Sequence, residues 1–158
     1  MVIAALTERR LTIATCESLT GGALAAALTA VPGASAVVRG GLVTYASDLK
    51  SRLAGVDAGW ISSHGVINRE TAVQMAVGVR QRLDADIGIS CTGVAGPDPQ
   101  DGVQPGLVWL AVARGRGSLE PLVLAERLQL VGDRAAIRAQ TVDAALDLIV
   151  RLLALEPG

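Results

Sequence analysis

Residues 11–30 read LTIATCESLTGGALAAALTA, and this stretch predicts a buried strand, a sharp turn and a helix in direct succession. Residues 11–15 are short, apolar and partly β-branched, which is typical of a strand covered on both faces. Gly21 and Gly22 then precede an alanine- and leucine-rich run, residues 23–30, which predicts a helix that stops before Pro32. A strand that leads into a helix in this way is a building unit of α/β sheets.

The same alternation continues along the chain. Residues 37–45, 87–90, 107–113 and 122–130 are strand-like, and the last two predict an antiparallel hairpin with a turn at 115–117. Helices are expected over residues 47–53, over 69–83 after the N-cap Asn68, and after the N-cap Asp133. We therefore predict one α/β domain over residues 1–158, a three-layer α/β/α sandwich with a mixed, mostly parallel sheet. Ligands of such sheets bind at the carboxyl ends of the strands.

Composition excludes several classes of protein. The chain has 158 residues, 51% of them hydrophobic, and a net charge of −1, so disorder and an electrostatic nucleic-acid or membrane surface are excluded. The apolar runs are shorter than the ~20 residues of a membrane span, and the start lacks the pattern of a secretion signal, so we expect a cytoplasmic protein. Cys16, Cys91 and His64 cannot form a standard structural zinc site, so no metal is expected. A chain with this share of hydrophobic residues can bury a subunit interface, so we expect a homo-oligomer.

Lys50 is the only lysine among 14 basic residues, and all the others are arginine. Lysine can lose its proton when it is desolvated, whereas arginine cannot, so a single lysine suggests a need for a neutral amine. The alternative is one surface lysine retained by chance. Tyr45, the only tyrosine, lies five residues earlier, across a strand-to-helix junction.

Ser18 follows the first strand and precedes the Gly21–Gly22 turn, where a serine either caps the helix or acts as a nucleophile. A desolvated lysine is an established base for such a serine, and Tyr45 could relay a proton. A rival pair is Ser47-x-x-Lys50, which matches the pattern of penicillin-binding enzymes. The companion Lys-Thr-Gly element of those enzymes is impossible here because there is no second lysine.

Two further segments could contact a ligand. The glycine-rich loop of residues 92–98 either allows close backbone approach to a ligand or is a plain connection. Arg134 and Arg138, one helical turn apart beside Asp133, either form local salt bridges or place one guanidinium on a phosphate.

Taken together, these motifs resemble the CinA C-terminal domain family, the nicotinamide mononucleotide deamidases. The resemblance runs in order over nearly the whole chain. It rests on Glu-Ser-x-Thr-Gly-Gly at 17–22, Pro-Gly-Ala-Ser at 32–35, Arg-Gly-Gly at 39–41, Val-Thr-Tyr at 43–45 leading to Lys50, His-Gly-Val at 64–66, Gly-Val-Ala-Gly-Pro at 93–97 and Gly-Asp-Arg at 132–134. The chain departs from the family where an asparagine is replaced by Ser47 and a cysteine by Leu19.

The resemblance implies an α/β/α sandwich that hydrolyses the carboxamide of nicotinamide mononucleotide to nicotinate mononucleotide and ammonia, without a metal or organic cofactor. It implies Ser18 as the nucleophile, with Lys50 and Tyr45 as its activating partners. Amides of the turns at Gly21 and Gly22 or at 93–96 would then hold the oxyanion. The residues expected to bind the small nucleotide substrate are Glu17, Thr20, Gly21, Gly22, Arg39, Thr44, Thr92, Gly93, Ala95 and Gly96.

Two alternatives to this enzyme remain. The chain could be a catalytically silent nucleotide-binding module with the same loops, or an acyl-transfer or peptidase-like enzyme that uses Ser47 and Lys50. Ser18, Tyr45 and Lys50 together favour the amidohydrolase over the silent module.

Overall fold

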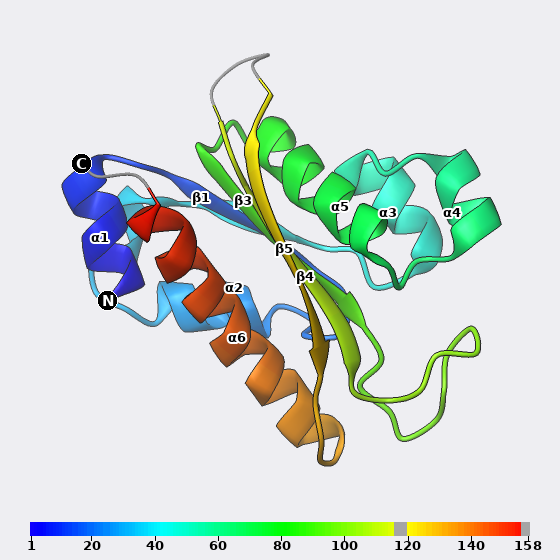
Figure 1. Cartoon of the computed structure of the whole chain (residues 1–158). Helices are drawn as coiled ribbons and strands as arrows, with labels where there is room; N and C mark the ends of the chain where they lie inside the picture. The colour runs from blue at the N-terminus through cyan, green and yellow to red at the C-terminus, as the bar shows by residue number, and fades with distance from the viewer. Residues whose placement is uncertain (116–119, 156–158) are drawn as a thin grey trace.

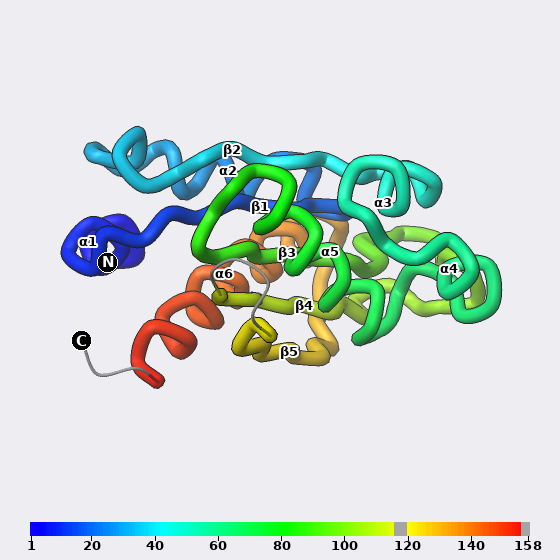
Figure 2. Tube along the Cα trace, turned by 90° about the horizontal axis from the view of Figure 1, so that it is seen from above, coloured from blue at the N-terminus to red at the C-terminus, as the bar shows by residue number. Residues whose placement is uncertain are grey.

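A computed structural model describes residues 1–115 and 120–155 as one sheet with helices on both faces (Figures 1 and 2). The strand order is β2-β1-β3-β4-β5. Their bounds are β1 Ile13–Glu17, β2 Val38–Val43, β3 Ile87–Gly93, β4 Leu107–Arg114 and β5 Leu122–Gln129. β1 lies parallel to both β2 and β3, whereas β4 is antiparallel to β3 and β5. The predicted mixed α/β fold is confirmed, and only β4 of these strands runs in the opposite direction.

Two groups of helices cover the sheet, as Figure 1 shows. One face carries α1 Val2–Arg9, α2 Ala23–Thr29 and α6 Arg134–Ala154. The other carries α3 Ser47–Ala54, α4 Ala58–His64 and α5 Arg69–Arg82, and a 3₁₀ turn at Ala34–Ala36 precedes β2. The predicted caps are confirmed, because Asn68 accepts a hydrogen bond from the Thr71 amide and Asp133 from the Ala136 amide.

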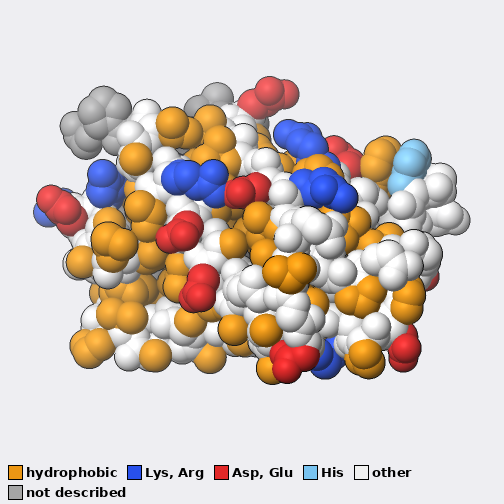
Figure 3. All heavy atoms as spheres, turned by 60° about the horizontal axis from the view of Figure 1, so that its bottom comes forward, with side chains coloured by type: hydrophobic (Ala, Val, Ile, Leu, Met, Phe, Trp, Pro, Cys, Tyr) orange, Lys and Arg blue, Asp and Glu red, His pale blue; other side chains and the backbone are white. Residues whose placement is uncertain are grey.

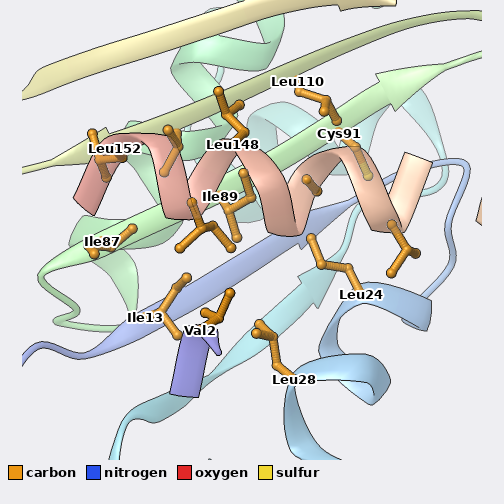
Figure 4. Close-up of a cluster of buried hydrophobic side chains, with 14 of the residues drawn as sticks. Val2, Ile13, Leu24, Leu28, Ile87, Ile89, Cys91, Leu110, Leu148 and Leu152 are labelled. Carbon is orange, nitrogen blue, oxygen red and sulfur yellow. The ribbon is translucent and has the colours of Figure 1, made fainter. Parts of the chain in front are cut away.

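The main core lies between the sheet and the α1–α2–α6 layer (Figure 4). Ile13, Ile89 and Leu110, from three neighbouring strands, belong to one cluster with Leu24 of α2 and Leu148 of α6, and all five side chains are almost fully buried. Each such side chain contributes about 1.5–3 kcal/mol when it leaves water. The layer therefore fixes the sheet from which the site's loops emerge.

Two helices were not predicted from the sequence. α1 buries Val2, Ile3 and Leu6 against the core, and an eight-residue helix is marginal without such packing. α4 buries none of its residues. Its first turn is capped by the Asp57 carboxylate, and the His64 ring stacks on the Trp60 ring with centroids 3.7 Å apart.

The hairpin of β4 and β5 is confirmed, although residues 116 and 117 of its predicted turn lie outside the described residues. No helix in the described parts of the chain is long and apolar enough to cross a membrane. On the face drawn in Figure 3, acidic and basic side chains are interspersed with apolar ones.

Candidate active site

The candidate site lies where β1, β2 and β3 end. β1 ends at Glu17 and β3 at Gly93, and the two strands are parallel neighbours, so the loops that follow them meet at one edge. β2 ends at Val43 on the other side of β1, and the segment after it leads into α3. This is the edge at which the sequence placed the site.

Ser18 and Lys50 meet at this edge. The Lys50 Nζ lies 3.1 Å from the Ser18 Oγ and also donates to the Thr44 carbonyl, 2.8 Å away. Lys50 is only 1% exposed and Ser18 9%, so the contact is shielded from bulk water. Ser47, the rival serine considered from the sequence, is exposed on the first turn of α3. The described hydrogen bonds of Lys50 include Ser18 but not Ser47.

Burial lowers the pKa of Lys50 from its ordinary value of 10.5. The cause is desolvation, which disfavours the charged ammonium, while the nearby thiols act weakly in the opposite direction. Burial also raises the pKa of the Cys16 thiol to about 12 and that of the Cys91 thiol to about 11. Both thiols therefore stay protonated at neutral pH, as expected of small buried side chains.

Glu17 organises the loop that carries Ser18. Its carboxylate is fully buried and accepts hydrogen bonds from the Thr20 hydroxyl at 2.6 Å and from the amides of Gly22, Leu24 and Ala25 at 2.8–3.0 Å. The negative charge thus satisfies the first amides of α2 and complements its dipole. The sequence placed Glu17 and Thr20 against the substrate, whereas here they bind each other and the helix end.

The Gly21–Gly22 turn is not open to an oxyanion. The Gly21 amide donates to the Ser18 carbonyl at 3.0 Å, and the Gly22 amide donates to the Glu17 carboxylate. Both residues have positive φ, 59° and 101°, which explains why glycine occupies them. Of the two turns expected to hold the oxyanion, this one therefore uses both of its glycine amides within the loop.

The turn at residues 93–96 lies opposite Ser18. A cavity of about 300 Å³ is lined by Ser18, Tyr45, the 93–96 turn, Asp98 and Arg134, among other residues. The Val94 amide donates to the Leu107 carbonyl, but in the described part of the chain no hydrogen bond uses the amides of Ala95 and Gly96. Both residues line the cavity, so their amides are the candidate donors of the 93–96 turn.

Tyr45 lines the same cavity but makes a different contact from the one expected. Its side chain is 56% exposed, and its hydroxyl accepts a hydrogen bond from Arg134 at 2.7 Å. The described hydrogen bonds of Ser18 and Lys50 do not include Tyr45. The geometry therefore pairs the serine with the lysine alone and makes the phenol part of the cavity wall.

Three further predicted residues lie away from the cavity surface. Thr44 and Thr92 are buried beside it. The Thr44 hydroxyl faces the Cys16 thiol, and the Thr92 hydroxyl donates to the Val66 carbonyl at 2.8 Å. Arg39 is in the first half of β2 and donates to the Leu83 carbonyl. Four residues of strand separate Arg39 from the end of β2, about 13 Å at ~3.3 Å per residue. The structure does not bring Arg39 to the site.

The sequence left the role of Arg134 and Arg138 open, and the structure gives a third answer. Arg134 donates to the Gly96 carbonyl at 2.8 Å as well as to Tyr45, and Arg138 donates to the carbonyls of Leu19 and Thr20. In the sequence, the one signal that could have indicated these contacts was the position of both arginines at the start of the last helix. Within residues 1–115 and 120–155, no cluster of three or more metal-ligating side chains is found.

These features define an α/β protein with a buried serine–lysine pair at the carboxyl edge of its sheet. The chain belongs to the CinA family, whose C-terminal domain model matches residues 1–153. It is 45% identical over 154 residues to a "CinA-like protein" of Frankia casuarinae, and 45% identical over 151 residues to one of Gemmatimonas aurantiaca. The alignments cover 98% and 95% of this chain but 34% of each relative, so the chain spans about a third of their length.

Solved structures share the fold over the whole domain. The competence/damage inducible protein CihA from Agrobacterium tumefaciens matches with a TM-score of 0.89 and 37% identity, covering 96% of this chain and 90% of that one. A competence-damaged protein (CinA) superfamily protein from Klebsiella pneumoniae matches with a TM-score of 0.90 and 33% identity, covering 98% and 94%.

Proposed function

We propose that the chain is a serine–lysine amidohydrolase that converts nicotinamide mononucleotide to nicotinate mononucleotide and ammonia. The observation that carries the proposal is the 3.1 Å contact between the Lys50 amine and the Ser18 hydroxyl, buried beside an open cavity. A lysine whose pKa is lowered by burial can be neutral and accept the serine proton. The identity of the substrate is proposed from the family resemblance of the motifs around both residues.

The acylation step follows from these groups. The Ser18 Oγ attacks the carboxamide carbon while the neutral Lys50 amine accepts its proton. The carbonyl oxygen becomes an oxyanion, for which the amides of Ala95 and Gly96 are the proposed donors; the Leu19 amide, next to Ser18 at the same cavity, is likewise unused among the described hydrogen bonds. The C–N bond then breaks, the Lys50 ammonium protonates the leaving nitrogen, and ammonia departs. Lys50 is neutral again at the acyl-enzyme.

Deacylation uses the same groups in reverse order. Lys50 takes a proton from water, the resulting hydroxide equivalent attacks the ester carbon, and the Ser18 oxygen leaves with the proton that Lys50 returns. The products are a carboxylic acid and the original serine. No group beyond Ser18, Lys50, the turn amides and water is needed to balance the reaction.

The test is ammonia release from nicotinamide mononucleotide by the purified chain and its variants. Ser18→Ala and Lys50→Met should each lower kcat at least ~10²-fold, as loss of a nucleophile or general base does. Ser47→Ala, an exposed serine on the same helix as Lys50, is the matched control and should keep most of the activity. Release that survives Ser18→Ala would exclude the assigned nucleophile. Calorimetric binding of the mononucleotide without ammonia release would instead indicate the silent binding module.

A further inference from the structure

The first turns of α6 contact both loops that carry the reacting groups. Arg134 reaches the Gly96 carbonyl on the loop after β3. Arg138, one turn further along, donates its Nε to the Leu19 carbonyl at 3.0 Å and its Nη2 to the Thr20 carbonyl at 2.8 Å, on the loop after β1. One rigid helix thus holds the nucleophile loop, residues 17–22, and the oxyanion turn, residues 93–96.

We propose that Arg134 and Arg138 are positioning residues that set the distance and orientation of the oxyanion turn relative to Ser18. The inference rests on the proposed amidohydrolase function, in which an oxyanion forms between these two loops. Preorganised donors stabilise an oxyanion only when they are fixed before the reaction, because reorganising them costs part of the gain.

The oxyanion turn needs such a restraint. Gly96 has φ +85° and no side chain, so its backbone is intrinsically free to rotate. The Gly106 amide holds the turn on one side through the Val94 carbonyl at 2.8 Å. Arg134 holds it on the other side through the Gly96 carbonyl. The unused amides of Ala95 and Gly96 lie between these two fixed points.

The nucleophile loop is restrained in the same way. The carbonyls that Arg138 binds belong to Leu19 and Thr20, the two residues that follow Ser18. Arginine suits both positions, because its planar fork can serve two acceptors with fixed geometry, whereas lysine presents a single point charge. A lysine at either position would keep the charge, but its compact ammonium lacks the planar fork with which the guanidinium reaches two separate acceptors.

The experiment compares Arg134→Lys and Arg138→Lys with Arg151→Lys. Arg151 is in the last turn of the same helix and pairs with Glu126, away from the site, so it is the matched control. We expect each of the first two variants to lower kcat about 10–100-fold with KM within about threefold, and the control to change neither. Because Arg134 is exposed, added guanidinium should restore part of the activity of Arg134→Ala. Thermal unfolding of every variant establishes that it is folded.

A second readout does not depend on the substrate. A fluorophosphonate probe forms a bond between its phosphorus and the Ser18 Oγ, fluoride leaves with the P–F electron pair, and Lys50 takes the serine proton. The rate of this labelling, followed by mass spectrometry, should fall in Arg134→Lys and Arg138→Lys as kcat does. If the wild-type chain releases no ammonia but labelling still depends on both arginines, the proposed function fails and the positioning role stands.

Two results would overturn the positioning role. One is folded Arg134→Lys and Arg138→Lys variants whose kcat and labelling rate both match those of wild type. The other is a large rise in KM with unchanged kcat and labelling, which would make the arginines direct substrate ligands instead.

Discussion

Replacing Glu17 by glutamine removes the negative charge around which the nucleophile loop folds. In the native chain one carboxylate oxygen accepts from the Thr20 hydroxyl and the amides of Gly22 and Leu24, and the other accepts from the Ala25 amide and, at 3.4 Å, from the Thr15 hydroxyl. Glutamine has a single acceptor oxygen. If it serves the first three donors, its NH₂ group faces the Ala25 amide, and two donors meet.

The expected loss of stability follows from these contacts. Hydrogen bonds to a charged group contribute about 1.5–3 kcal/mol and neutral ones about 1 kcal/mol, so the three retained bonds weaken. The unsatisfied Ala25 amide adds about 1–3 kcal/mol. A neutral side chain costs less to bury than a carboxylate, which offsets part of the loss. We expect a net decrease of about 2–4 kcal/mol in the free energy of unfolding, out of the ~5–15 kcal/mol usual for a domain.

Urea unfolding followed by circular dichroism measures this change, and the m-value should stay constant. Glu126→Gln is the control, because it removes an ion pair at the surface that contributes less than about 1 kcal/mol. The reasoning is refuted if Glu17→Gln unfolds within about 1 kcal/mol of wild type but raises KM strongly. That outcome would show that the carboxylate binds the substrate, as the sequence suggested.

Three other predictions follow from single positions. Folding lowers the pKa of Lys50, so between that lowered pKa and 10.5 the unfolded state binds more protons than the folded state. The free energy of unfolding should therefore rise with pH in this range. Urea titrations at several pH values should show this rise in wild type and not in Lys50→Met. A Cβ at Gly78 would lie 1.6 Å from the Ala54 carbonyl oxygen, so Gly78→Ala should cost about 2–4 kcal/mol in urea unfolding despite alanine's ~1 kcal/mol better helix propensity. Asn68→Ala removes the cap of α5 and the bond to the Trp60 indole, so it should cost about 1–2 kcal/mol and shift the tryptophan emission to longer wavelength.

The architecture could be predicted because its signals are local. The apolar residues before Ser18, the glycine turn and the alanine-rich run each fix one element with little help from distant residues. The pairing of Ser18 with Lys50 could also be predicted, although 32 residues separate them. Both follow strands that lie side by side and parallel, and the carboxyl ends of such strands share one edge of the sheet.

The roles of the loop residues could not be predicted, because they depend on where other elements end. A glutamate after a strand can face a ligand or a helix, and only the closure of α2 over β1 directs Glu17 inward. The amides of Gly21 and Gly22 donate to the Ser18 carbonyl and the Glu17 carboxylate, whereas the sequence motif alone does not indicate that these donors are occupied. α1 was missed for a related reason, since its helix depends on the core it packs against rather than on its own eight residues.

Strand polarity separates two residues that the sequence assigned to one site, Lys50 for catalysis and Arg39 for substrate binding. Arg39 and Lys50 both belong to motifs around β2, but Arg39 lies near the start of the strand and Lys50 follows its end. Only the end of β2 opens toward Ser18, so the amine reaches the hydroxyl while the guanidinium binds a carbonyl elsewhere. Tyr45 also lies at the carboxyl edge of the sheet, but its hydroxyl accepts a hydrogen bond from Arg134 at the start of α6. The contacts of a residue at this site therefore depend on which neighbouring element lies beside it at the sheet edge. For Lys50 that neighbour is the loop after β1, which carries Ser18.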